Sequence, residues 1–241
     1  MSASVNKPYE IVERALELSR ADGCVVIADE ESSANLRWAG NALTTNGVTR
    51  GRTLTVIATV DGARGTASGV VSRSAVTVDE LEPLVRAAEA AARGAGPAED
   101  AQPLVTGVAP SPEFTQAPAE TSSAVFADFA PALGEAFARA RAGGRELYGF
   151  ANHEMVSSYL GTSAGLRLRH DQPNGTLELN AKSPDRTRSA WAGVPRGTSG
   201  TWTRRRSTRS WPYVWAGPSG GSSCPRAGTR RCCRRPRWRT C

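Results

Sequence analysis

The chain has 241 residues, of which 39% are hydrophobic and 22% charged, a length that allows one large or two small domains with a sizeable core. Its formal net charge of +7 suits a nucleic-acid or membrane-surface partner, but the position of the charge excludes that inference for most of the chain. Residues 196–241 hold 12 Arg and no acid, which leaves 18 basic and 23 acidic residues, a net charge of −5, in residues 1–195.

Cysteine usage divides the chain at the same place. Cys24 is alone in the first 195 residues, whereas four cysteines lie in the last 18. A single cysteine in a Val-rich segment is typical of a reduced compartment. The first ten residues, MSASVNKPYE, lack the apolar segment of a signal peptide, and no run approaches the ~20 apolar residues that cross a bilayer. We therefore expect a cytoplasmic protein without a membrane partner.

The first 96 residues alternate helical and strand patterns. An amphipathic helix is expected after Lys7-Pro8, with an apolar stripe that includes Val12 and Leu16. Cys24 to Ala28 reads as a buried strand, and residues 35–68 read as three further strands with turns at Asn46-Gly47 and Asp61-Gly62. A second helix, capped by Thr77 or Asp79, is expected to run through Leu81 to a stop at Gly94. These elements predict an α+β domain, a helix-flanked antiparallel β-meander, over residues 1–96.

Five prolines in residues 97–120 cannot continue either periodic structure, so we interpret this segment as a Pro/Ala-rich linker. A long surface loop inside one domain is the alternative. A third helix follows, opened by Ser122 or Ser123 and kinked or restarted at Pro131. After it come five short strands, with a hairpin predicted at Asn174-Gly175. Residues 121–195 are thus predicted to form a second, mostly antiparallel β region with one helix.

The tail, residues 196–241, has no Leu, Ile, Phe, Met, acid or Lys, and it cannot supply an apolar face. Its composition is typical of a GC-rich gene read out of frame: Ser207 to Trp211 can be written TCG ACG CGG AGC TGG, which contains D-A-E-L in another register. Our hypothesis is a frameshift near Gly193 to Pro195 and a disordered tail. An uninterrupted open frame on resequencing of this locus would reject it.

Four tail cysteines without paired C-x-x-C spacing are weak evidence for a zinc site. Twelve arginines interleaved with tryptophans predict nonspecific adhesion to nucleic acids rather than specific binding. A DNA-binding protein that depends wholly on this tail is a further hypothesis. Retention of DNA by residues 1–193 alone would contradict such a dependence on the tail.

One stretch also resembles a known family. It combines Arg37-x-x-x-Asn41, a glycine turn, a strand with small residues, and the hairpin Asp61-Gly62-x-x-Gly65. In these features the chain resembles the amino-terminal and partial central domains of the TldD/PmbA (TldD/TldE) metallopeptidases, also described as modulators of DNA gyrase. The resemblance covers about Ile11 to Gly193 and is closest to the PmbA, or TldE, branch.

The resemblance implies a truncated TldE-like subunit that takes part in the proteolysis of small or unfolded peptides. Zinc would belong to a TldD-like partner with an HExxxH motif, in a hetero-oligomer, and this chain would hold no cofactor and be inactive alone. The alternative is a modulator of DNA gyrase, or of a toxin-antitoxin system, that acts by binding only.

The residues themselves offer few candidates for chemistry. His153-Glu154 is the one pair typical of a zinc peptidase, but Ser157 and Ser158 stand where the second His would be needed. We therefore predict no catalytic and no metal residue in this chain. Five basic residues alternate along the expected strands of the second region and are candidates for a peptide groove or an interface, with a solvated sheet face as the alternative: Arg167, Arg169, Lys182, Arg186 and Arg188.

Overall fold

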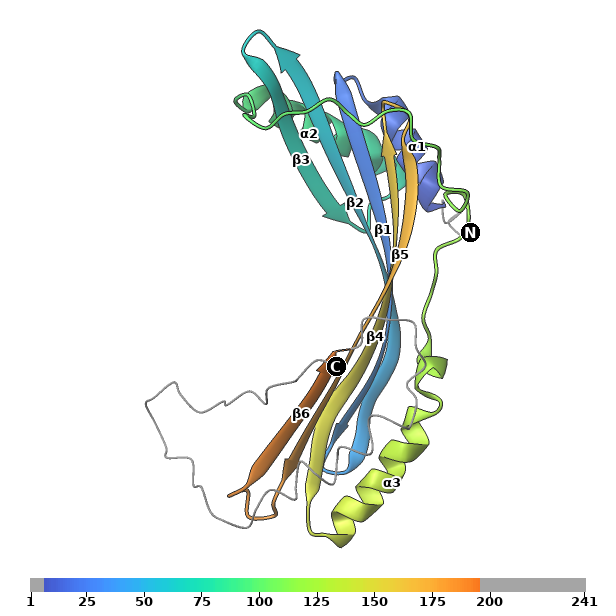
Figure 1. The fold of residues 1–241 in the computed structure, drawn as a ribbon, viewed down its shortest axis with the longest axis vertical. Coiled ribbons are helices and arrows are strands. Elements are labelled where there is room, and N and C mark those ends of the chain that lie inside the picture. Colours follow the sequence, from blue (N-terminus) through green and yellow to red (C-terminus); the bar gives the residue numbers. More distant parts are fainter. Residues whose placement is uncertain (1–6, 196–241) are drawn as a thin grey trace, which may run out of the picture.

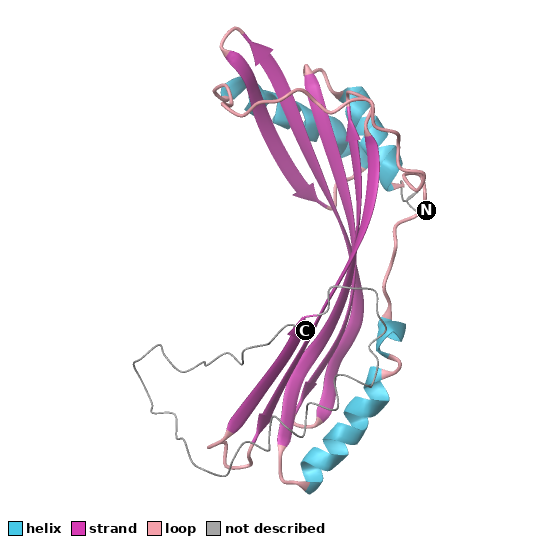
Figure 2. Cartoon of the chain, viewed as in Figure 1, coloured by secondary structure: helices cyan, strands magenta, loops and turns pink. Residues whose placement is uncertain are grey.

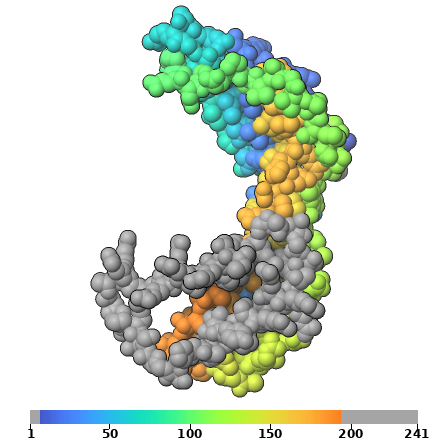
Figure 3. All heavy atoms as spheres, viewed as in Figure 1, coloured from blue at the N-terminus to red at the C-terminus, as the bar shows by residue number. Residues whose placement is uncertain are grey.

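The computed structural model describes residues 7–195. Figures 1 and 2 show a curved body in which long strands run from one end to the other and helices lie at both ends. The described residues keep this curved outline when all heavy atoms are drawn (Figure 3). The elements in chain order are α1 (Pro8–Leu18), β1 (Gly23–Ala39), β2 (Ala42–Gly62), β3 (Gly65–Ser74), α2 (Leu81–Gly94), α3 (Phe129–Ala142), β4 (Glu146–Thr162), β5 (Arg167–Lys182) and β6 (Ser189–Pro195), with short 3₁₀ turns at Val78–Glu80 and Ser123–Phe126.

All six strands belong to one antiparallel sheet in the order β3-β2-β1-β4-β5-β6. The α+β class predicted from the sequence is confirmed. The central strand β1 pairs with β2 from Gly23 to Ala39 and with β4 from Val25 to Trp38. Strands of globular proteins usually span about 5–6 residues, whereas β1 spans 17 and β2 spans 21. These long strands give the molecule its elongated shape.

The helices all pack on one face of the sheet, because the buried residues of β1 are the even-numbered ones. Cys24, Val26 and Ala28 belong to an apolar core under α1 and α2, and Leu36 and Trp38 belong to a second core under α3. We call this the helix face and the opposite side the open face. In the half that holds α3, the helix lies on the outer side of the curve (Figure 1).

The predicted helices are confirmed, and their starts have local causes. Pro8 occupies the first position of α1, where no backbone hydrogen bond is lost. Before α2, the Glu80 carboxylate accepts hydrogen bonds from the Thr77 amide and hydroxyl, at 2.9 and 2.8 Å. Pro131 is the third residue of α3 and follows the turn at Ser123–Phe126, so the helix restarts there, because proline is tolerated in a first turn.

Two predicted turns are wrong. Asn46-Gly47 lies inside β2 and Asn174-Gly175 inside β5, each paired with a neighbouring strand. The turn between β1 and β2 is instead Gly40-Asn41, both with positive φ (57° and 63°), the geometry of the two-residue hairpin turns that favour these residues. The five short strands expected after α3 are two long strands and β6. At the other predicted hairpin, Gly62 does pair with Gly65, with Ala63 and Arg64 as the turn.

Residues 95–122 contain no α-helix or strand and lie along the sheet as a strap from α2 to α3 (Figure 1). The Ala98 amide bonds the Thr66 carbonyl at 2.9 Å, and the Ser111 amide bonds the Arg167 carbonyl at 2.8 Å. Phe114 is buried in the core under α1. The segment expected as a linker therefore has fixed contacts with β3 and with β5. The boundaries 1–96, 97–120 and 121–195 stay a prediction, since independent folding of the parts is untested.

The predictions for residues 196–241 lie outside the described part of the chain. Within residues 7–195, no helix has both the length and the hydropathy needed to span a membrane.

Candidate functional site

Polar side chains gather at the middle of the helix face, between the two cores and beneath the strap. Strand β4 brings Ser157 and Tyr159 there, and β5 brings Arg169 and Asp171, because alternate residues of paired strands share a face. The Ser157 hydroxyl donates to Asp171 at 2.7 Å, and the Tyr159 hydroxyl donates to the Gln116 carbonyl of the strap at 2.8 Å. Every one of these contacts joins the sheet to itself or to the strap.

His153 and Glu154 point to opposite faces of the sheet. The pair lies on β4, and successive side chains of a strand alternate between faces. His153 Nδ1 lies 2.8 Å from the Thr121 hydroxyl of the strap, and burial lowers the pKa of this His. A zinc peptidase motif needs the His and Glu on one helical turn, so this pair cannot form one. Ser157 and Ser158, where a second His would stand, are hydrogen bonded to Asp171 and Asp29.

The open face carries a pair of carboxyl groups at its middle. Glu31 on β1 and Glu154 on β4 are diagonal neighbours, since Glu154 pairs with Ser33 and Glu31 with Val156. A hydrogen bond with Glu31, followed by burial and the negative charge of Glu31, raises the pKa of Glu154. Two carboxyl groups that share a site favour one proton between them. The pair marks an acidic centre on a face that no described helix covers.

The five basic residues predicted as a groove do not share one surface. Arg167 makes a two-pronged ion pair with Glu13 of α1, with both N···O distances 2.7 Å. Arg169 has a side chain only 6% exposed, pairs with Asp171, and lies 5.4 Å from the Tyr159 ring centre. Both arginines are on the helix face under α1 and the strap, where they join elements of the chain itself.

The other three lie at the far end of β5. Lys182 Nζ is 4.9 Å from the centre of the Tyr148 ring. Arg186 and Arg188 are exposed in the turn to β6, and Arg186 has a φ of 55°. Their role in a groove or interface stays a prediction, and the structure separates them from Arg167 and Arg169 by most of the strand.

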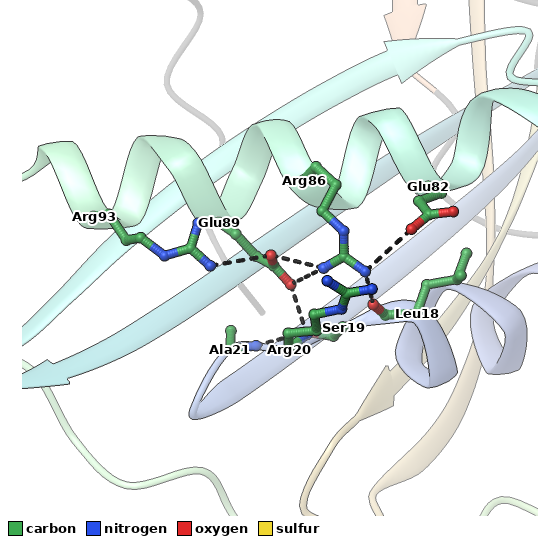
Figure 4. Close-up of polar contacts among 8 residues, drawn as sticks. All are labelled: Leu18, Ser19, Arg20, Ala21, Glu82, Arg86, Glu89 and Arg93. Atoms are coloured by element: carbon green, nitrogen blue, oxygen red, sulfur yellow. Dashed lines mark hydrogen bonds and ion pairs between the residues drawn. The ribbon is translucent and has the colours of Figure 1, made fainter.

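A buried charge cluster lies between α1 and α2 (Figure 4), and it was not among the predicted sites. Glu89 is 1% exposed. Its carboxylate accepts the Arg20 amide at 2.6 Å, Arg86 at 2.8 Å and Arg93 at 3.3 Å. Burial acts to raise its pKa, but these donors outweigh burial, and the pKa is lowered. The spacing of Glu82, Arg86, Glu89 and Arg93 at three and four residues could have indicated it.

The surface of the described chain also has a hollow. A shallow cavity of about 260 Å³ lies between the β2–β3 hairpin and the end of α2, lined by residues such as Asp61, Arg64 and Arg93. In residues 7–195, no group of three or more His, Cys, Asp or Glu side chains is placed to hold a metal ion. The polar groups described above serve mainly as contacts between elements.

Fold and geometry together define an α+β protein built on one long, twisted antiparallel sheet with helices on a single face. Solved structures with this fold are found among TldE and proposed modulators of DNA gyrase. TldE from Thermococcus kodakarensis matches with a TM-score of 0.54 and 12% identity, over 78% of this chain and 42% of that one. A proposed modulator of DNA gyrase from Bacteroides thetaiotaomicron matches with a TM-score of 0.55 and 14% identity, over 86% and 48%.

A third structure, of a proposed modulator of a DNA gyrase from Thermotoga maritima, has a TM-score of 0.51 and 15% identity, over 79% of this chain and 43% of that one. The resemblance to the TldD/PmbA family is thus confirmed at the level of the fold. The chain spans less than half the length of each of these structures. No family model matches the sequence, and no curated protein matches it.

Proposed function

We propose that this chain is a TldE-like subunit of a cytoplasmic TldD/PmbA-type assembly and acts by binding, without catalytic residues of its own. The observation that carries the proposal is the fold likeness to TldE over 78% of the chain. The chain corresponds to less than half of that structure. Its part in the assembly would be an interface and a wall next to the peptide substrate.

The placement of polar residues supports a binding role. The one pair typical of a zinc peptidase, His153 and Glu154, lies on a strand with the two side chains on opposite faces. The hydroxyls of Ser157 and Tyr159 are held by Asp171 and the strap, so they do not project into open space as nucleophiles. The open face, which no described helix covers, offers a broad surface for a binding partner instead.

Zinc chemistry in this proposal belongs to a TldD-like partner. A metal ion there would lower the pKa of its bound water and polarise the scissile carbonyl, and a neighbouring Glu would handle the proton. This chain would neither bind that ion nor move that proton. Its contribution would be to complete the complex in which the peptide is cleaved.

Co-expression tests the proposal directly. The full chain and a TldD-like subunit, only one of them tagged, are expressed together, and the complex is isolated by affinity and size-exclusion chromatography. We expect the two chains to co-elute, zinc to follow the partner, and cleavage of an unfolded peptide to require the partner. A partner whose HExxxH Glu is changed to Gln is the matched control. Stoichiometric zinc and cleavage by the isolated chain would refute the proposal.

A second candidate is suggested by the two structures described as proposed modulators of DNA gyrase. In that case the chain would bind gyrase without any peptidase role. Affinity capture with the tagged full chain distinguishes the two: recovery of gyrase subunits in the absence of a TldD-like protein favours direct modulation. Recovery of a TldD-like subunit without gyrase favours the assembly role.

A further inference from the structure

Strand β3 is an outer strand of the sheet, and one row of its backbone groups points away from its neighbour β2. Gly62 and Gly65 pair across a two-residue turn, so the odd-numbered residues of β3 direct their N–H and C=O groups toward β2. The even-numbered residues, among them Ser68, Val70 and Ser72, direct theirs outward. The Thr66 carbonyl confirms this phase, because it accepts a hydrogen bond from Ala98 of the strap at 2.9 Å.

The even-numbered residues of β3, whose backbone groups point outward, have an order of side-chain types that is the same in both directions along the strand. Thr66, Ser68, Val70, Ser72 and Ser74 form a palindrome of hydroxyl and apolar side chains centred on Val70. In an antiparallel pair of two such strands in this register, Val70 faces its counterpart and Ser68 faces Ser72. Ser74 would face Thr66, whose carbonyl already accepts the Ala98 amide, so the new strand pairing covers Ser68, Val70 and Ser72. No charged side chain faces a like charge, because Arg73 on the other side of the strand would face Ala67. Val70 is 58% exposed, so an apolar side chain is open to solvent at the centre of this edge strand.

The helix above this edge leaves room for a second copy. Gly69 lies directly under α2, since a Cβ there would be 2.2 Å from the Ala92 amide nitrogen and 2.3 Å from the Ala88 carbonyl oxygen. The charged residues of α2 face α1 (Figure 4). The opposite flank carries the exposed residues Ala87 and Ala91. Small side chains on that flank would let two α2 helices approach closely when two sheets join edge to edge.

We propose that two copies of this chain pair through β3 in antiparallel register about Val70, giving a continuous sheet across a two-fold axis. The interface is isologous, with the same strand and helix flank contributed by each copy. The outward N–H and C=O groups of Ser68, Val70 and Ser72 then find partners in the second strand. This pairing does not depend on the proposed function, because it needs no TldD-like subunit.

Light scattering after size-exclusion chromatography tests the pairing with the full chain. At tens of micromolar in 0.3 M salt, we expect twice the chain mass of 25.5 kDa. Val70→Lys places two ammonium groups opposite each other and should give a monomer. Val78→Lys changes a valine that is also exposed, at 48%, but lies outside the strand, and should stay dimeric. A monomeric wild type, or a dimeric Val70→Lys, would overturn the proposal.

Hydrogen exchange identifies the contact. Peptides that cover residues 66–74 should exchange at least tenfold more slowly in the wild-type dimer than in Val70→Lys, while peptides from β4 should be unchanged. A double variant, Ser68→Asp with Ser72→Asp, places carboxylates opposite one another and gives a second route to the monomer, with circular dichroism confirming the fold. Equal exchange of residues 66–74 in dimer and monomer would contradict pairing through this edge.

Discussion

The buried carboxylate of Glu89 is expected to be a major source of stability for the half of the molecule that holds α1 and α2. Glu89→Gln keeps the volume of the side chain and one oxygen that can accept the Arg20 amide. It removes the negative charge that Arg86 and Arg93 face at 2.8 and 3.3 Å. The change therefore tests the charge and leaves the shape intact.

The size of the effect follows from the exposure of the partners. Breaking a buried ion pair by removing one member costs about 3–5 kcal/mol when the other stays buried. The side chains of Arg86 and Arg93 are 28% and 56% exposed, so water recovers part of their solvation. We expect Glu89→Gln to lower the free energy of unfolding by about 2 kcal/mol. This value lies between the cost of losing a neutral hydrogen bond and the cost of breaking a fully buried ion pair.

Urea unfolding followed by far-ultraviolet circular dichroism measures this change. With a slope near 2 kcal/mol per molar urea, the midpoint should fall by about 1 M. Glu82→Gln is the matched control, because Glu82 is 54% exposed and lies 3.4 Å from the same Arg86; its effect should stay below about 0.5 kcal/mol. Equal shifts of the urea midpoint in the two variants would refute the argument that burial makes the Glu89 charge more stabilising than the Glu82 charge.

The same carboxylate predicts a pH dependence. Its pKa in the folded protein lies below the ordinary value of 4.5, so its contribution to stability is fully present above pH 4.5 and is lost as the pH falls through the folded pKa. The difference between wild type and Glu89→Gln should therefore be constant from pH 5 to 7 and shrink in more acidic buffer. A difference that grows with acid would contradict the lowered pKa.

Three further changes test other parts of the structure. Gly69→Ala should lower stability by about 1–3 kcal/mol, because its Cβ would meet the α2 backbone, whereas Gly51→Ala, with no atom within 4 Å, should change the thermal midpoint little. Tyr159→Phe removes the bond to the Gln116 carbonyl and should cost about 1 kcal/mol, with faster hydrogen exchange in the strap; unchanged exchange would contradict that contact. For His153, whose pKa is lowered by burial, stability should rise as the pH increases from the folded pKa toward 6.5 and level off above it, and His153→Gln should flatten that rise.

Local patterns in the sequence predicted much of the fold. Alternation at Leu54, Val56 and Ala58 located the buried side of β2, and all three are fully buried. The apolar faces of the helices and the helix restart at Pro131 could also be predicted, since capping and proline effects act within a single turn. These features depend on neighbours in the chain, which a sequence displays directly.

Strand length and the role of the strap could not be read in this way. Asn46-Gly47 has turn chemistry, yet it continues β2 because Leu36 and Asn35 of β1 pair beside it. The contact of Ser111 with Arg167 joins positions 56 residues apart, and no local sequence pattern at either residue predicts it. The same holds for the candidate site. The sequence shows that Arg167 and Arg169 alternate along a strand, but it does not show that Glu13 pairs with Arg167 and Asp171 with Arg169.

The pairing of β1 with β4 ties residues before the strap to residues after it along 14 positions, from Val25 to Trp38. A single proteolytic cut in the exposed part of the strap, near residues 105–108, would break the covalent chain but none of those pairs. The two fragments should then stay bound and elute together under native conditions, separating only in denaturant. The strand pairing of β1 with β4 would then hold the two fragments together. An intact strap would not be needed once the protein has folded.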